Sequence, residues 1–140
     1  MSPGAPAAGY SGTPLARKLG IKAGARVHLI DAPAHAWSLL EPLPEDVVQV
    51  SAVDTQTDLV WLFCLARERL ANALARLRVQ IRSDVAIWVS WPKKASKVAT
   101  DITEDSIREV CLPLGLVDIK VCAVDATWSG LKLVIRKALR

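Results

Sequence analysis

A short basic segment rich in tryptophan carries the residues of this sequence best suited to binding a ligand. It runs from Trp88 to Lys97 and contains two tryptophans, one proline and three lysines. Its lysines could hold a phosphate or carboxylate group, helped by the N-terminus of a helix expected near Thr103. A solvated basic loop packed over a tryptophan is the simpler alternative. The candidate ligand-binding residues in this segment are Ser90, Trp91, Lys93, Lys94 and Lys97.

Two further groups of candidates follow expected strands. Asp31 follows the first of these strands, and a turn near the C-terminus contains Asp125, Thr127 and Trp128. Ligands of open parallel sheets bind beyond the carboxyl ends of the strands, so we expect these residues to share one edge with the basic segment. Two alternatives stay open for this turn. Asp125 could cap the turn, and Trp128 could either cover a ligand or plug the sheet edge.

Catalytic signals are weak throughout the sequence. His35 lies near Asp31, which suggests a base and its orienting carboxylate, but no nucleophile accompanies them. His28 alternates with apolar residues and is interpreted as a core histidine. Ser90 is outside a G-x-S-x-G turn, and there is no P-loop. The three cysteines are dispersed singly, which indicates buried thiols and excludes a zinc or other metal site: Cys64, Cys111 and Cys122.

The composition indicates one packed domain. The chain has 140 residues, of which 51% are hydrophobic and 23% charged. We expect residues 1–12 to form a flexible arm and residues 13–140 to form the domain. No apolar run approaches the roughly 18 residues needed to cross a bilayer, and no secretory signal is visible, so we expect a cytoplasmic protein with no membrane contact.

Hydrophobic patterning predicts the elements that would position the candidate residues. Two continuous apolar runs, 59–65 and 85–89, are typical of strands covered on both faces of a parallel sheet. Further strands are expected at 26–30, 47–50, 117–124 and 131–136, and helices at 15–19, 34–41, 66–81 and from 103 onward. We therefore predict an α/β fold, a three-layer Rossmann-like sandwich with a mostly parallel sheet and a C-terminal antiparallel hairpin. We expect Trp61 and Trp88 in the core, and an exposed edge position for either would favour a homodimer interface.

This order of elements resembles a truncated S-adenosylmethionine-dependent methyltransferase over roughly residues 24–136. That superfamily has a glycine-rich loop after the first strand, which lets the backbone approach the cofactor closely. Here Asp31-Ala32-Pro33 stands in its place, without a glycine. We therefore expect no cofactor, S-adenosylmethionine included.

Three motifs resemble those of a small bacterial family of unknown function. They are Gly9–Leu15, Trp88–Lys94 and Thr127–Arg136, with the sequences GYSGTPL, WVSWPKK and TWSGLKLVIR. The resemblance spans most of the chain. It implies no activity, because that family has none assigned.

Together these observations favour a non-catalytic Rossmann-like domain that binds a small anionic ligand or a protein partner. A divergent methyltransferase-like transferase is the first alternative. The second is a weak nucleic-acid-binding protein that uses Arg76, Arg78 and Arg82 with the lysines. The net charge of +4 is mild for nucleic-acid binding, which argues against the second alternative.

Overall fold

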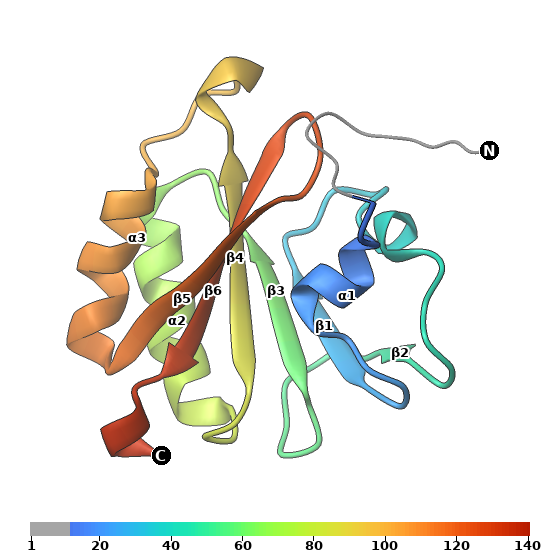
Figure 1. Ribbon diagram of the computed structural model, residues 1–140. Coiled ribbons are helices and arrows are strands. Elements are labelled where there is room, and N and C mark those ends of the chain that lie inside the picture. The colour runs from blue at the N-terminus through green and yellow to red at the C-terminus, as the bar shows by residue number, and fades with distance from the viewer. Residues whose placement is uncertain (1–11) are drawn as a thin grey trace.

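The structure, a computed structural model, describes residues 12–140 and is built on one six-stranded sheet with the order β2-β1-β3-β4-β6-β5 (Figure 1). The first four strands in the chain pair in parallel, and β6 runs antiparallel to both of its neighbours, β4 and β5. This arrangement confirms the predicted mostly parallel α/β sandwich with its C-terminal antiparallel hairpin. The strands are β1 (Arg26–Ile30), β2 (Val48–Gln49), β3 (Leu59–Phe63), β4 (Ala86–Pro92), β5 (Leu116–Ala123) and β6 (Trp128–Ile135).

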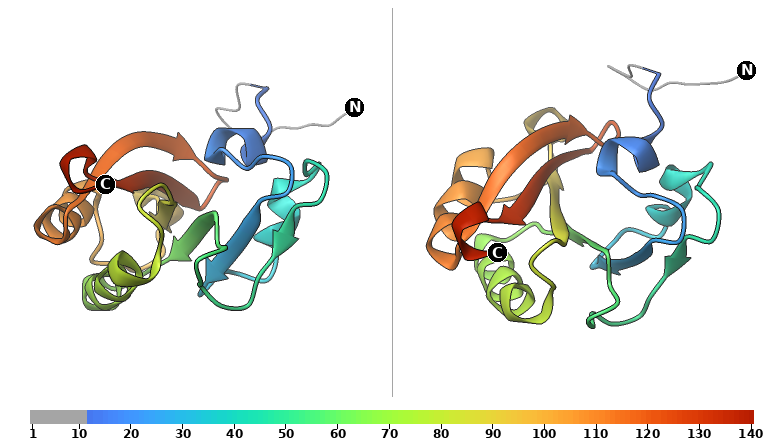
Figure 2. Two further views of the ribbon diagram at one scale, coloured as in Figure 1. Left: turned by 90° about the horizontal axis from the view of Figure 1, so that it is seen from below. Right: turned by 60° about the horizontal axis from the view of Figure 1, so that its bottom comes forward.

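The two central strands owe their place to their continuous apolar sequences. All five residues of β3 are buried, and Trp61 and Trp88 have no exposed surface, which confirms their predicted place in the core. A strand buried on both faces needs cover from two layers. Helices α2 (Arg67–Gln80) and α3 (Glu104–Cys111) cover one face, while α1 (Leu15–Leu19) and the 3-10 helix η1 (Trp37–Leu40) cover the other (Figure 2).

Several element boundaries differ from those predicted. The helix expected at 34–41 is only the short η1, the strand expected at 47–50 is only β2, and β4 continues to Pro92, past its predicted end at residue 89. Pairing with β6 extends β4, since Trp91 lies opposite Ser129 and Pro92 opposite Trp128. Trp128 is therefore the first residue of a strand and does not belong to the turn. Cross-strand pairing of this kind depends on partners distant in sequence, which local patterns do not reveal.

Arginines near the end of α2 and just after it bond to neighbouring loops. Arg82 donates to the backbone oxygens of Thr55 and Thr57 and to the carboxylates of Asp58 and Asp84. Arg78 donates to the Leu114 oxygen at 3.0 Å. Two of the three arginines considered for nucleic-acid binding are thus engaged within the protein.

Within residues 12–140, no helix is both long and apolar enough to cross a membrane.

Candidate functional site

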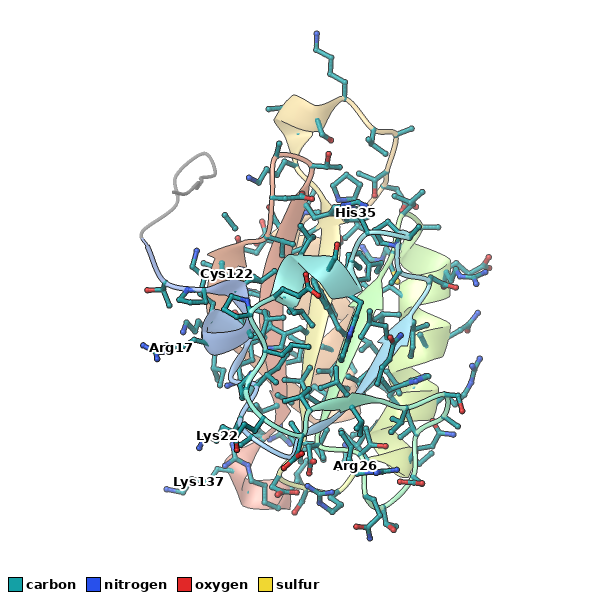
Figure 3. All side chains as sticks on the ribbon, turned by 90° about the vertical axis from the view of Figure 1, so that its right-hand side faces the viewer. Arg17, Lys22, Arg26, His35, Cys122 and Lys137 are labelled. Carbon is teal, nitrogen blue, oxygen red and sulfur yellow. The ribbon has the colours of Figure 1, made fainter. Side chains whose placement is uncertain are left out.

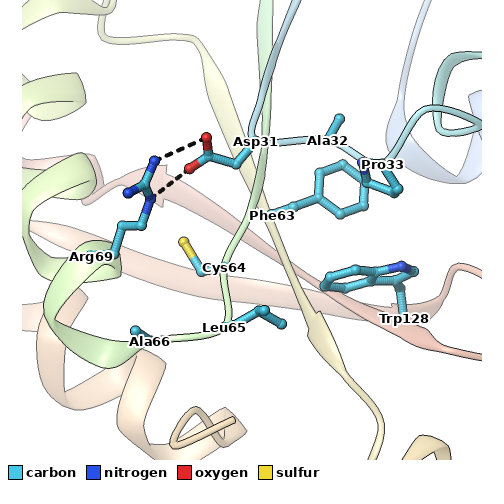
Figure 4. Close-up of a pocket in the computed structure, with 9 residues that line it drawn as sticks. All are labelled: Asp31, Ala32, Pro33, Phe63, Cys64, Leu65, Ala66, Arg69 and Trp128. Atoms are coloured by element: carbon cyan, nitrogen blue, oxygen red, sulfur yellow. Dashed lines mark hydrogen bonds and ion pairs between the residues drawn. The ribbon is translucent and has the colours of Figure 1, made fainter. Parts of the chain in front are cut away.

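A cavity of about 310 Å³ lies at the edge of the sheet where β1 and β3 end and β6 begins. It is formed where the parallel strands present their carboxyl ends, and the β5–β6 hairpin reaches the same edge because Trp128 pairs with the last residue of β4. Figure 4 shows the side chains that surround it. They are Asp31, Ala32, Pro33, Phe63, Cys64, Leu65, Ala66, Arg69 and Trp128.

Aromatic rings make one wall of the cavity. Phe63 is almost fully buried at the end of β3, and its ring meets the half-buried Trp128 edge-to-face, with centroids 5.1 Å apart and planes at 87°. On its other side Phe63 packs against Trp61, with a centroid distance of 4.7 Å. Edge-to-face packing of this kind is a favourable arrangement for aromatic pairs, so the rings hold each other in place. Trp128 is therefore a wall of the cavity that is fixed by the core.

A single ion pair forms the polar end of the cavity. Arg69 donates from Nε to Asp31 Oδ2 at 2.8 Å and from Nη2 to Oδ1 at 3.1 Å. These hydrogen bonds, together with the negative charge of Asp31, raise the pKa of Arg69, which stays charged. Both side chains remain substantially exposed, and ion pairs between exposed groups are weak, so each partner is available to a charged ligand.

The turn after β1 obtains its shape without glycine. Asp31 has a φ of 55°, in the left-handed region that most residues avoid and that aspartate tolerates. The chain therefore turns sharply at the carboxyl end of β1, and Ala32 and Pro33 become part of the cavity wall. A sharp turn at this point therefore does not require a glycine.

Cys64 lies on the cavity wall as a protonated thiol. Burial raises the pKa of Cys64 to about 11; the negative charge of Asp31 adds to this rise, and the positive charge of Arg69 opposes it. Thiolates, and not thiols, are the reactive nucleophiles, so Cys64 contributes surface and no nucleophile near neutral pH.

The buried thiols predict a loss of stability at alkaline pH. Burial also raises the pKa of Cys111 to about 11, whereas ordinary thiols ionise near 9.0. The folded state holds these protons more tightly than the unfolded chain does, so their contribution is fully present below pH 9 and is lost as the pH rises toward 11. Urea unfolding at pH 8, 9, 10 and 10.5 should show this fall, and it should be shallower in the double variant Cys64→Ala, Cys111→Ala. If the free energy of unfolding falls equally with pH in the two proteins, the buried thiols are not the cause of the fall.

The structure brings only two of the predicted site residues to the cavity, Asp31 and Trp128. Ser90 is fully buried, and its Oγ accepts a hydrogen bond from Trp61 Nε1 at 2.8 Å. Trp91 is buried in the cluster beneath α2 and α3. Both residues contribute to the core, and neither lines the cavity.

The predicted lysines lie beyond the cavity on an extension of β4. This extension holds the 3-10 helix η2 (Lys94–Ser96), and Lys94 and Lys97 are exposed on it. Lys93 is half-buried, and its backbone N–H donates to the Thr127 oxygen at 2.7 Å. The lysines line none of the cavity, so their role as an anion site stays a prediction.

Asp125 caps the hairpin turn, as one of the sequence alternatives held. Its Oδ1 accepts hydrogen bonds from the backbone N–H groups of Thr127 and Trp128, each at 2.8 Å. Its Oδ2 lies 3.4 Å from His35 Nε2. The suggested pairing of His35 with Asp31 is therefore wrong, because Asp31 bonds to Arg69 and His35 approaches Asp125. His28 donates from Nδ1 to the Val50 oxygen at 2.8 Å, which is a structural role.

Sequence reasoning missed Arg69, the cationic side chain of the cavity. It lies 38 residues after Asp31, and only the pairing of β1 with β3 brings the two together. A usable signal existed, because the first turn of a helix that follows a parallel strand starts at the same edge as the ligand site. The missed wall residues Phe63, Cys64 and Leu65 follow from the same rule.

Comparison with solved structures places the fold among methyltransferases. A SAM-dependent methyltransferase from Aquifex aeolicus superposes with a TM-score of 0.61 at 12% identity, over 86% of this chain and 87% of that one. A putative methyltransferase from Thermoplasma acidophilum gives 0.57 at 8% identity, over 89% and 75%. LepI C52A, solved in complex with SAH and a substrate analogue, gives 0.53 at 10% identity, over 89% of this chain and 47% of that one. At these identities the likeness shows the fold alone.

No protein-family model and no curated protein matches the sequence. The resemblance of the three motifs to a small bacterial family thus stays a prediction, and part of the first motif lies outside the described residues. The expectation that this chain takes no cofactor is wrong, because solved proteins with this fold include SAM-dependent enzymes and one complex with SAH.

Proposed function

We propose that this chain is a divergent methyltransferase-like transferase whose cavity binds S-adenosylmethionine. The observation that carries the proposal is the cavity itself. It lies at the carboxyl edge of a sheet with the methyltransferase fold, and a single ion pair stands at one end of otherwise largely apolar walls. Its volume is within the range of about 300–1,000 Å³ that is common for small-molecule sites.

The chemistry of the lining residues fits this cofactor. Its amino-acid end carries one ammonium and one carboxylate, which complement Asp31 and Arg69 respectively. Because that ion pair is exposed, exchanging it for two bonds to the ligand costs little. The rings of Phe63 and Trp128 offer π-faces to adenine or to a sulfonium, which aromatic rings attract as they attract other cations.

The bound cofactor would supply an electrophilic methyl group. The chain's own residues would orient the ligand relative to the methyl acceptor, and this proximity accelerates a reaction. They would also keep water from the apolar surface of the ligand. Among the lining residues that the structure describes, none offers a general base, because Cys64 holds its proton and Asp31 is paired with Arg69. The methyl acceptor must therefore arrive with a free lone pair, such as that of an unprotonated amine or a thiolate.

The same observation favours a second candidate, a domain that binds the cofactor without catalysing transfer. The two functions share the ligand and differ in turnover. Label from methyl-labelled cofactor would reach an acceptor only in the first.

Calorimetric titration with S-adenosylmethionine tests the proposal. The wild type should bind one molecule per chain, and Arg69→Met should weaken binding about tenfold or more, since a charge-assisted hydrogen bond contributes about 1.5–3 kcal/mol to binding in general. Arg67→Met is the matched control, because Arg67 is in the same helical turn but pairs with Glu109 at 2.8 Å, outside the cavity. The absence of binding heat for the wild type at millimolar ligand would refute the proposal.

A further inference from the structure

A second hollow, of about 390 Å³, lies between α1 and β5 and is lined by basic side chains from both elements. Arg17 and Lys18 reach it from α1, and Lys120 reaches it from β5. Among residues 12–140, no acidic residue lines it. This hollow, called the α1–β5 groove below, shares no residue with the cavity at the sheet edge.

Strand pairing brings another cation to the same face of the sheet. Lys120 lies directly opposite Lys132 in the β5–β6 ladder, and Lys132 lies opposite Trp88 of β4. The Trp88 indole donates to the Leu19 oxygen of α1, so this face is turned toward α1. Lys132 accordingly extends to the C-terminal end of α1, where its Nζ would lie 3.9 Å from a Cβ built on Gly20.

This arrangement of charges is unfavourable in the free protein. Like charges directly opposite each other on neighbouring strands destabilise a sheet. Within residues 12–140, Arg17, Lys120 and Lys132 form no ion pair, whereas Arg82 and Arg108 each bind carboxylates. Arg17, Lys120 and Lys132 thus carry charges that no carboxylate within residues 12–140 offsets.

The pKa of the Cys122 thiol responds to the positive charges of the groove. Burial raises its pKa, and Lys18 and Lys120 oppose that rise. Figure 3 shows Cys122 on the side of the molecule where Arg17, Lys22 and Lys137 also lie. Positive charge therefore gathers along this side of the protein, with the groove within it.

We propose that the α1–β5 groove binds a phosphate group, held by Arg17 and Lys120, with Lys18 in the groove lining and Lys132 opposite Lys120 adding positive charge. Multiple cations from separate elements suit a multiply charged oxyanion, which can accept hydrogen bonds from several of them at once. A phosphate ester of a small molecule and the backbone of a nucleic acid share this chemistry. The inference stands independently of the cofactor proposal, because it uses different residues.

Because Lys120 and Lys132 repel each other, replacing Lys120 should change two quantities in opposite directions: the Tm without pyrophosphate should rise, and the further increase of Tm with pyrophosphate should fall. With sodium pyrophosphate as the probe, the Tm of the wild type should rise relative to sodium chloride at equal ionic strength. Lys120→Gln should have a higher Tm than the wild type without pyrophosphate, since the repulsion from Lys132 is gone. It should also lose most of the pyrophosphate-dependent rise, and its Kd should increase roughly tenfold.

Arg76→Gln is the matched control, because it removes one positive charge from an exposed position on α2, away from the groove. It should keep the full pyrophosphate response. Cys122 provides a local readout, and its alkylation, followed by peptide mass mapping, should slow when pyrophosphate is bound. A wild type without a pyrophosphate response, or a Lys120→Gln variant with an unchanged one, would overturn the proposal.

A short oligonucleotide titrated in parallel distinguishes the two sources of phosphate. A nucleic-acid ligand should bind more tightly than pyrophosphate and should lose affinity steeply as salt rises. If the ligand of the groove is a small phosphate ester, the oligonucleotide should bind more weakly than pyrophosphate does. If the oligonucleotide binds but pyrophosphate does not compete with it, the oligonucleotide occupies another site, and a pyrophosphate response that depends on Lys120 then indicates a small phosphate ester as the ligand of the groove.

Discussion

Trp88→Ala is expected to lower the free energy of unfolding by about 3–5 kcal/mol, the usual cost of replacing a buried large aromatic residue with alanine. Trp88 has no exposed surface and packs in the cluster that joins β3 and β4 to α1. Its Nε1 also donates to the Leu19 oxygen at 2.9 Å. The substitution therefore leaves a cavity and frees a carbonyl group at the end of a helix only five residues long.

Urea unfolding followed by circular dichroism measures this loss. Trp88→Phe keeps most of the ring volume and loses the hydrogen bond, so it should cost much less than the alanine variant. Trp37→Ala is a useful comparison, because Trp37 is half-buried in η1 and should have a smaller effect. A loss below about 1 kcal/mol for Trp88→Ala, which is typical of surface positions, would mean that Trp88 does not anchor α1 as described.

Trp128→Ala is expected to reduce S-adenosylmethionine affinity by about tenfold or more while the chain stays folded. The indole forms a cavity wall and is held edge-to-face by Phe63, so its removal widens the cavity and takes away a stacking surface. Stacking on an aromatic side chain contributes about 1–3 kcal/mol per base in nucleic-acid complexes, which sets the scale for adenine. Because Trp128 is only half-buried, the loss of folding stability should be smaller than for Trp88→Ala.

Calorimetry of the wild type, Trp128→Ala and Trp128→Phe separates the two roles of this ring. The phenylalanine variant keeps a π-face and should retain most of the affinity. An unchanged Kd in Trp128→Ala would place the ligand away from this wall, even if the wild type binds it. That outcome would leave the fold assignment intact and would remove the site as drawn in Figure 4.

The predictable part of this structure is what local sequence patterns determine. The apolar run of β3 is long enough to require cover on both faces, so its central place follows from its residues alone. The position of Asp31 at the cavity follows from its place directly after a parallel strand, and this inference needs no knowledge of its partner. The buried positions of Trp61 and Trp88 follow from the same patterns.

The remainder depends on pairings between distant segments. The sequence predicts the basic segment at the ligand edge because the local pattern ends β4 at residue 89. Pairing with β6 extends that strand to Pro92 and carries the lysines outward. Ser90 became a core residue because Trp61 donates to it. Arg69 was missed because its relation to Asp31 exists only in the assembled sheet.

The position of β6 has a consequence for how this chain reaches its native state. β6 is the last strand in sequence, yet it lies inside the sheet, between β4 and β5. Until residues 128–135 have left the ribosome, the backbone edge of β4 lacks its partner, and the apolar side chains that β6 contributes to the core are missing. Such an edge invites pairing with other chains. Helices and parallel strands formed earlier in synthesis thus await a late insertion, and this protein should depend on prompt completion, or on a chaperone that shields β4, to avoid aggregation at the ribosome.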